Sequence, residues 1–126
     1  MPKRALRLRF ALPRYKYPRN AWRRAIHATA RRQLGATPVD YLSSDRLDIE
    51  VMLHLDDSHL EIMDLDNRLK DVLDALQGRA GGPKSIHTLK AFVPNDNQIF
   101  RASVEKRRPP KQNRSRGGWV TIRRYR

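Results

Sequence analysis

The sequence predicts an α+β fold, a two-layer α/β sandwich in which helices cover one face of a mixed β-sheet. Two observations support this class. Hydrophobic residues alternate in four segments and recur at helical spacing in two others, and these elements follow the order β–α–β–α–β–β without a clean βαβ repeat. At 126 residues, the chain is most simply a single domain spanning 1–126.

Alternation of hydrophobic and polar residues predicts the strands, at 5–12, 46–55, 98–105 and 119–125. The segment 46–55 gives the clearest pattern. Its five inward positions are all aliphatic: Leu47, Ile49, Val51, Leu53 and Leu55. This strand should lie in the core of the sheet.

The first helix should run from Asn20, as its N-cap, to about Gly35. Its expected inner stripe consists of Trp22, Ala25, Ile26, Thr29 and Gln33. Its expected outer side carries Arg23, Arg24, His27 and Arg31. That outer side is either a solvated basic face or a face that follows a phosphate backbone.

The second helix should run from about Asp66 to Gln77, with a hydrophobic face at i, i+3, i+4 and i+7 formed by Leu69, Val72, Leu73 and Leu76. A glycine-rich segment ends it. We expect a turn at 56–59, a strand or a helix at 84–92, and a basic, mobile loop at about 106–118.

Composition favours a nucleic-acid partner. The net charge is +14 and the sequence pI is about 11.2, whereas the acids are concentrated at 40–74 and Asp96 stands almost alone beyond them. The alternative is a basic protein without such a partner. No apolar run could span a membrane, and the absence of cysteine excludes disulfides and thiolate chemistry and fits a cytoplasmic protein.

The stretch "MDLDNRLKDVLDAL" at 63–76 is the strongest candidate for chemistry. Asp64 and Asp66 enter the second helix from one side, where they could bind Mg²⁺, and Lys70 follows Asp66 by one turn. Alternatively, Asp66 only caps the helix, and the spacing alone favours this interpretation. We expect Asp71 and Asp74 on the outer face, solvated or paired with basic residues.

A second group of possible ligands, His54, Asp56, Asp57 and His59, could bind a transition metal. Its spacing matches no known motif, and a turn at the end of a strand explains it better. Neither an EF-hand nor a P-loop fits the chain.

The segments "DLDNRLKDVLDAL" and "PNDNQIFRASVEKR" together resemble the RusA-type Holliday-junction resolvases, which are crossover-junction endodeoxyribonucleases. The resemblance implies that Asp64, Asp66 and Asp96 bind Mg²⁺, with Mn²⁺ as a possible substitute. It also implies that Lys70 is catalytic and Asn67 accessory. Family members are homodimers that nick four-way junctions symmetrically.

We therefore expect a metal-dependent, structure-selective DNA endonuclease of bacterial or phage origin, active at the nucleoid. Seven basic residues should contact the DNA: Arg23, Arg24, Arg31, Lys106, Arg107, Arg108 and Lys111. The alternatives are a non-catalytic nucleic-acid-binding module and a nuclease that cuts flaps or RNA.

Overall fold

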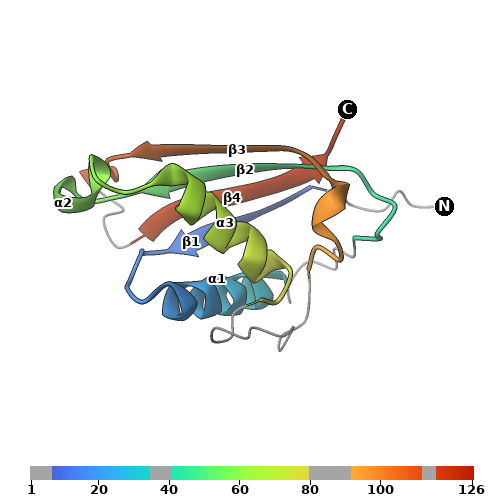
Figure 1. Ribbon diagram of the computed structural model, residues 1–126, viewed down its shortest axis with the longest axis horizontal. Helices are drawn as coiled ribbons and strands as arrows, with labels where there is room; N and C mark the ends of the chain where they lie inside the picture. The colour runs from blue at the N-terminus through green and yellow to red at the C-terminus, as the bar shows by residue number, and fades with distance from the viewer. Residues whose placement is uncertain (1–6, 35–40, 80–91, 112–115) are drawn as a thin grey trace.

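The computed structural model describes residues 7–34, 41–79, 92–111 and 116–126. These residues form a mixed four-stranded sheet with the helices on one of its faces, which confirms the predicted α+β class (Figure 1). In chain order the elements are β1 Leu8–Pro13, α1 Arg19–Leu34, β2 Leu47–His54, α2 Asp57–Leu60, α3 Leu65–Leu76, the 3-10 helix η1 Asp96–Gln98, β3 Ile99–Arg107 and β4 Arg116–Arg124.

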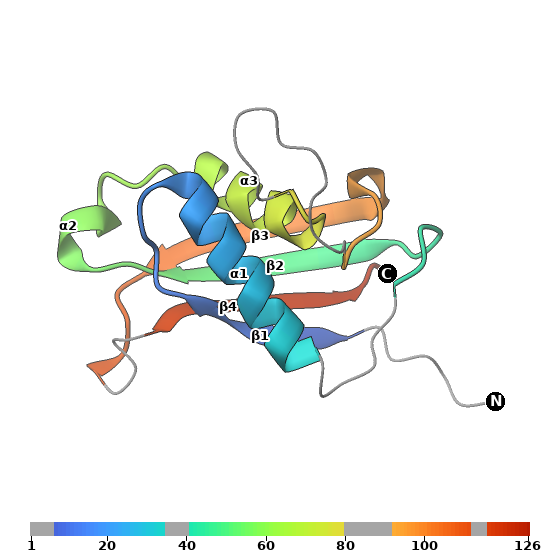
Figure 2. The same cartoon turned by 90° about the horizontal axis from the view of Figure 1, so that it is seen from below.

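The strand order in the sheet is β1-β4-β2-β3. β4 pairs antiparallel with both β1 and β2, whereas β2 and β3 are parallel. A parallel pair needs a crossover connection, and here it contains α2, α3 and η1. Figure 2 shows α1 and α3 side by side across the same face of the sheet.

The inward positions predicted for β2 are correct. Leu47, Ile49, Val51, Leu53 and Leu55 are all buried, and they join one hydrophobic cluster with residues of the helices and the other strands. The remaining buried members of that cluster are Leu8, Phe10, Leu12, Trp22, Ile26, Ala30, Tyr41, Val72, Ala75, Leu76, Val93, Val120 and Ile122. The core therefore lies between the sheet and the two long helices.

The inner side of α1 differs from the prediction. The helix begins at Arg19, where the carbonyl of Pro18 accepts bonds from the backbone N–H groups of Ala21 and Trp22 at 3.0 and 3.3 Å. His27, expected on the outer side, is buried, and its ring lies 4.9 Å from that of Phe92. The segment that follows the glycine-rich stretch thus covers a side of α1 that the sequence pattern alone leaves exposed.

The loop predicted at 106–118 is shorter in the structure, because β3 extends to Arg107 and β4 begins at Arg116. Two glycines allow β4 to begin at Arg116, before the predicted start of this strand at 119. A Cβ on Gly117 would lie 2.1 Å from the carbonyl oxygen of Pro13, and one on Gly118, which has φ +110°, would lie 1.9 Å from that of Met52. Residues 80–91, which include most of the ambiguous segment 84–92, lie outside the described residues.

Within the described residues, no helix has the length and apolar character needed to cross a membrane.

Candidate functional site

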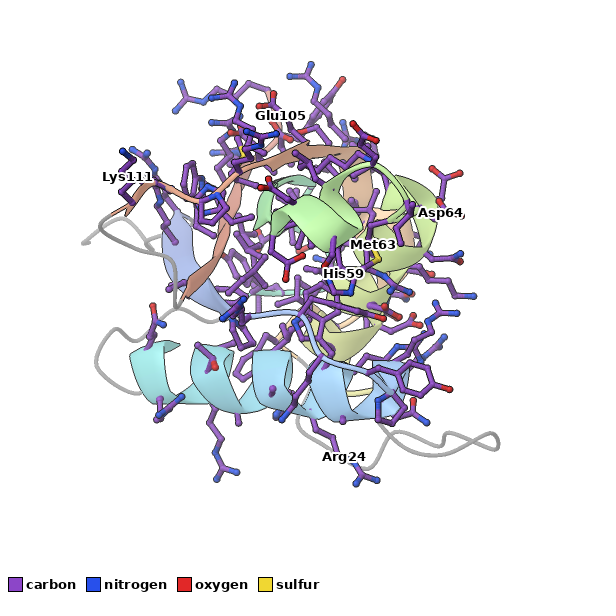
Figure 3. All side chains as sticks on the ribbon, turned by 90° about the vertical axis from the view of Figure 1, so that its left-hand side faces the viewer. Arg24, His59, Met63, Asp64, Glu105 and Lys111 are labelled. Carbon is purple, nitrogen blue, oxygen red and sulfur yellow. The ribbon has the colours of Figure 1, made fainter. Side chains whose placement is uncertain are left out.

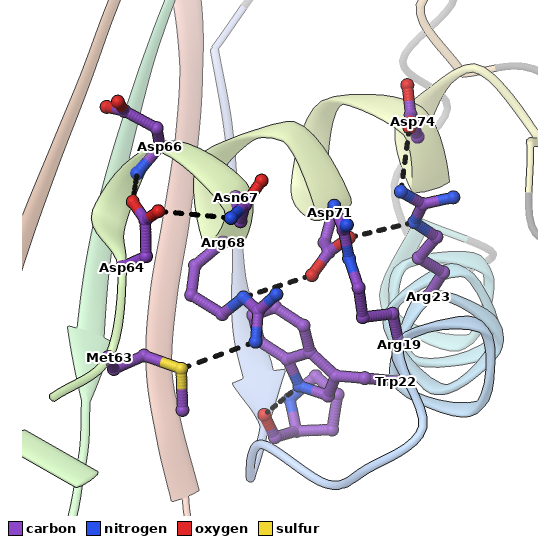
Figure 4. A network of polar contacts seen from close by, with 11 residues as sticks. Arg19, Trp22, Arg23, Met63, Asp64, Asp66, Asn67, Arg68, Asp71 and Asp74 are labelled. Atoms are coloured by element: carbon purple, nitrogen blue, oxygen red, sulfur yellow. Dashed lines mark hydrogen bonds and ion pairs between the residues drawn. The ribbon is translucent and has the colours of Figure 1, made fainter.

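The N-terminus of α3 carries the first predicted acids. Asp64 is the N-cap: one carboxylate oxygen accepts from the backbone N–H of Asp66 at 2.9 Å, and the other accepts from Nδ2 of Asn67 at 3.1 Å (Figure 4). The alternative that Asp66 caps the helix is therefore wrong, because the N-cap lies two residues earlier. Asp66 lies inside the first turn with an exposed side chain, and Asn67 orients the carboxylate of Asp64.

Three of the predicted site residues line one pocket. Asp66, Lys70 and Asp96 surround a volume of about 390 Å³ along the outer side of α3. The other lining residues are Leu69, Leu73, Asp74, Gln77 and Arg79. Asp64 is not among them, so the structure brings two of the three predicted metal ligands and the predicted catalytic lysine to the same pocket.

Asp96 reaches this pocket because the chain returns to the end of α3. The backbone N–H groups of Phe92 and Val93 donate to the carbonyl of Leu76 at 2.7 and 3.1 Å. Asp96 then opens η1, and the buried side chain of Gln98 fixes this turn. Its amide nitrogen donates to the carbonyls of Leu42 and Asp45 at 2.8 and 2.9 Å.

The role of Gln98 is a feature that sequence reasoning missed. Its side-chain oxygen accepts from the backbone N–H of Asn95 at 2.9 Å, so the same side chain closes η1 and ties it to the loop before β2. A glutamine two residues after Asp96 was the only signal in the sequence. It holds the position of Asp96 without lining the pocket itself.

Asp71 corrects a second expectation. It was predicted on the outer face of its helix, but it is fully buried at 0% exposure between α3 and α1. One carboxylate oxygen accepts from Nε of Arg19 and of Arg23, both at 2.9 Å, and the other lies 3.1 Å from Nε of Arg68 (Figure 4). The expected pairing with basic residues is confirmed, whereas the expected solvation is wrong.

Arg68 closes this cluster on the side of β1. Its guanidinium lies over the ring of Tyr15 at 4.7 Å and donates to the sulfur of Met63 at 3.3 Å. The contact between Arg68 and Asp71 is an ion pair without hydrogen-bond geometry. Three guanidinium groups thus compensate one buried carboxylate, which fixes α3 against α1.

The predicted DNA-binding residues separate into two groups. Arg23 is only 13% exposed, and its guanidinium group pairs with Asp71 and Asp74 within the protein. Arg24, Arg31 and Lys111 have exposed side chains. Figure 3 shows Arg24 on the outer side of α1, on the opposite side of the molecule from Glu105 of β3.

The basic residues near the end of β3 have protein partners. The Nζ of Lys106 donates to the carbonyl of Met63 at 3.2 Å, Arg107 pairs with Glu105, and Arg108 pairs with Asp57 at 2.9 Å. Arg107 and Arg108 are nevertheless exposed. Their ion pairs lie in solvent and are weak enough for a phosphate to replace the carboxylate.

His54 ends β2, whereas Asp57 and His59 lie in the short helix α2, which forms where the sequence predicted a turn. Asp56 caps α2 and accepts from the hydroxyl of Ser58 at 2.7 Å and from the ring and backbone nitrogens of His59. The Ser58 bond, followed by those of His59, lowers the pKa of Asp56 to about 2. Among the described residues, no three His, Asp or Glu side chains gather closely enough to hold a metal ion.

No family model matches this sequence, and none of the curated proteins matches it.

The pocket along α3 combines three carboxylates, of Asp66, Asp74 and Asp96, with the ammonium group of Lys70 and the guanidinium group of Arg79. Carboxylate oxygens are the ligands that Mg²⁺ prefers, and a lysine beside them can contact a phosphate. The pocket follows α3 from Asp66 to Gln77, a length of about 16 Å at the rise of an α-helix. This is long enough to accept a segment of phosphodiester backbone.

Proposed function

We propose that the protein is a magnesium-dependent endonuclease that resolves Holliday junctions in DNA recombination and repair. Asp66 and Asp96 would bind the metal together with water, and Lys70 would contact the scissile phosphate. Asp64, which caps α3 outside the pocket, would join them only if its carboxylate turned toward the ion. The observation that carries the proposal is the pocket shared by Asp66, Lys70 and Asp96, in a chain of net charge +14.

The donor set fits Mg²⁺. This ion binds through few carboxylates and keeps several waters, so Asp66 and Asp96 are suitable ligands. Asp64 is compatible with the same role although it caps α3. Each of its oxygens accepts one hydrogen bond, and a carboxylate offers about four lone-pair sites. Mn²⁺ has the same preference for oxygen ligands and could replace Mg²⁺.

When bound, the metal would supply an activated water and neutralise charge on the phosphate. Lys70, one turn after Asp66, would stabilise the additional negative charge that develops in the transition state. Asn67 would keep Asp64 oriented through the hydrogen bond that it already makes. Cleavage adds water across one P–O bond and leaves one new phosphate end and one new hydroxyl end.

A four-way junction presents two symmetric strands, and a two-fold homodimer would present two symmetric pockets. Phosphate contacts would come from exposed basic residues such as Arg24, Arg31, Arg108 and Lys111. Because each contact releases counterions from the DNA, the affinity should fall steeply with salt.

The test is cleavage of a four-way junction by the purified protein in a Mg²⁺ titration. Asp66→Asn should lower the cleavage rate by at least about 100-fold, because it removes a charged group needed in the transition state, while junction binding persists. The matched control is Glu61→Gln, which removes the charge of an exposed acid at the end of α2, outside the pocket, and should leave the rate unchanged. Equal rates for wild type and Asp66→Asn would show the assignment to be wrong.

The second candidate is a non-catalytic nucleic-acid-binding module, favoured by the exposed arginines of α1 and by the net charge. The same titration separates the two. Tight binding with no cleavage at any Mg²⁺ or Mn²⁺ concentration, and no effect of Asp66→Asn, supports the module. Cleavage of flaps or RNA in preference to junctions would support a nuclease with another substrate.

A further inference from the structure

The two edges of the sheet differ in how well they are protected. β1 is six residues long, ends in Pro13, and its Ala11 N–H donates to the side chain of Gln33 on α1 at 3.1 Å. β3 is nine residues long, and among the described residues it pairs only with β2. Figure 1 shows β3 as the outermost strand. A long unpaired edge strand is a template for pairing with another chain.

The backbone direction of β3 identifies the groups available for such pairing. The carbonyl of Arg107 accepts from the N–H of Leu55 at 3.0 Å and therefore points toward β2. Because successive residues of a strand point their backbone groups to opposite sides, the free N–H and C=O groups after the β-bulge at Phe100 belong to Ala102, Val104 and Lys106.

The side chains of β3 are self-complementary about Ser103. Arg101 lies two residues before Ser103 and Glu105 two residues after it, with side chains 61% and 51% exposed. If two copies of β3 pair antiparallel about Ser103, each Arg101 lies opposite the Glu105 of the other copy. Opposite charges in directly facing positions stabilise a strand pair, and like charges destabilise it.

The neighbouring registers lack this complementarity. A two-fold axis at Val104 sets Arg101 opposite Arg107 of the other copy, and an axis at Ala102 sets Glu105 opposite Ile99. With the axis at Ser103, the free backbone groups of Ala102 meet those of Val104. All three axes bring free backbone groups together, so it is the charge pattern that selects the register at Ser103.

The side chains of Arg101 and Glu105 lie on the face of the sheet that carries no described helix. Asp48, the register neighbour of Arg101 on β2, contacts Arg101 at 3.7 Å and Arg123 of β4 at 3.2 Å. Lys106, on the alternate side of β3, reaches Met63 beside α3. If Arg101 pairs with Glu105 of a second copy, Asp48 still has its ion pair with Arg123. The described helices α1 and α3 lie on the other face of the sheet, where α3 contacts β3 (Figure 2).

We infer that the protein forms a homodimer by antiparallel pairing of β3 with the β3 of a second copy about Ser103, which joins two four-stranded sheets into one. The inference gives an interface and a register to the homodimer of the proposed function. It rests on the strand itself and not on the metal chemistry, so either one can fail alone.

A cysteine scan tests the register, because the chain contains no cysteine. In Ser103→Cys the two thiols would face each other in a non-hydrogen-bonded pair with Cα atoms about 4.5 Å apart, within the range that a disulfide spans. In the matched control Arg101→Cys the two Cα atoms would be offset by four residues, about 14 Å along the strands, which is too far. Mild oxidation should give a covalent dimer of the first variant only.

Charge exchange tests the pairing in solution by sedimentation velocity. Arg101→Glu and Glu105→Arg should each weaken dimerisation by at least about tenfold, and the double variant should restore it. Arg7→Glu, an equal change of charge just before β1, should leave it unchanged. A monomeric wild type, or equal crosslinking of Ser103→Cys and Arg101→Cys, would overturn the inference. Asp66→Asn should dimerise normally, which separates this result from any loss of cleavage.

Discussion

Asp66 and Asp71 are five residues apart on α3 and have opposite surroundings. Asp66 is exposed and lines the pocket with Lys70, whereas Asp71 is fully buried among three arginines. The two residues lie on different sides of one helix. The comparison shows that a cluster of acids in a basic sequence can contain a structural carboxylate and a candidate catalytic one.

The partners of the two acids explain the difference. Asp71 meets Arg19 and Arg23, which lie 52 and 48 residues away in the sequence, on a face that also buries Val72 and Ala75. The face of Asp66 carries Lys70 and continues to Gln77 along the pocket. One side of α3 therefore fixes the helix to α1, and the other is available to a ligand.

The largest effect that we expect follows removal of the buried charge. Asp71→Asn should lower the free energy of unfolding by about 3–5 kcal/mol, because it leaves buried guanidinium groups without their carboxylate. Urea denaturation measures this loss. The matched control Asp74→Asn breaks a single pair with Arg23 at a partly exposed position and should cost about 1 kcal/mol or less. Equal losses for the two variants would contradict the distinction drawn between them.

A smaller effect separates the two roles suggested for Asp64. Asp64→Ala should lower the free energy of unfolding by about 1 kcal/mol, because it removes the N-cap of α3. Asp64→Asn should preserve stability, since asparagine is an equally good N-cap, but should reduce Mg²⁺-dependent cleavage. Thermal denaturation and the cleavage assay together measure the two effects. Full activity of Asp64→Asn would show that Asp64 acts only as the N-cap of α3.

The smallest effect concerns a buried group that, unlike Asp71, has no opposite charge. Burial, and secondarily Arg107, lowers the pKa of His54, and its Nδ1 has no hydrogen-bond partner in the described part of the chain. The neutral ring therefore contributes stability that is present above its unfolded pKa of about 6.5 and lost as the pH falls below it. The slope for one proton is at most about 1.4 kcal/mol per pH unit.

In His54→Gln, the free energy of unfolding, measured by urea denaturation, should fall less between pH 7 and pH 5 than it does in the wild type. The measurement is the difference between wild type and variant, so that contributions common to both proteins cancel. An unchanged pH dependence would show that His54 is protonated equally in the folded and unfolded chains.

Periodicity predicted the sheet well, because β2 alternates over its whole length and all five inward residues are buried. It failed where long-range contacts decide the environment. His27 is covered by Phe92 and Asp71 by Arg19, and neither partner is visible at helical spacing. The extension of β4 through Gly117 depends on the close approach of Pro13, which no local pattern reports.

For the pocket, the motif predicted Asp66, Lys70 and Asp96 as a group, and the structure places all three in its lining. It did not predict that Asp64 would lie outside, because an N-cap and a metal ligand need the same residue type at the same position. The contribution of Gln98 depends on the carbonyls of Leu42 and Asp45, which are distant in the sequence.

The parallel pairing of β2 with β3 has a consequence for how the pocket is assembled during folding. Residues such as Ile49 and Ala102 become neighbours only after α3 has crossed the sheet, and Gln98 closes loops of similar size. The entropy of closing these loops must be overcome before their contacts stabilise the chain. Asp66 and Lys70 can occupy their helix early, whereas Asp96 joins them only when the slowest, most non-local part of the sheet has formed.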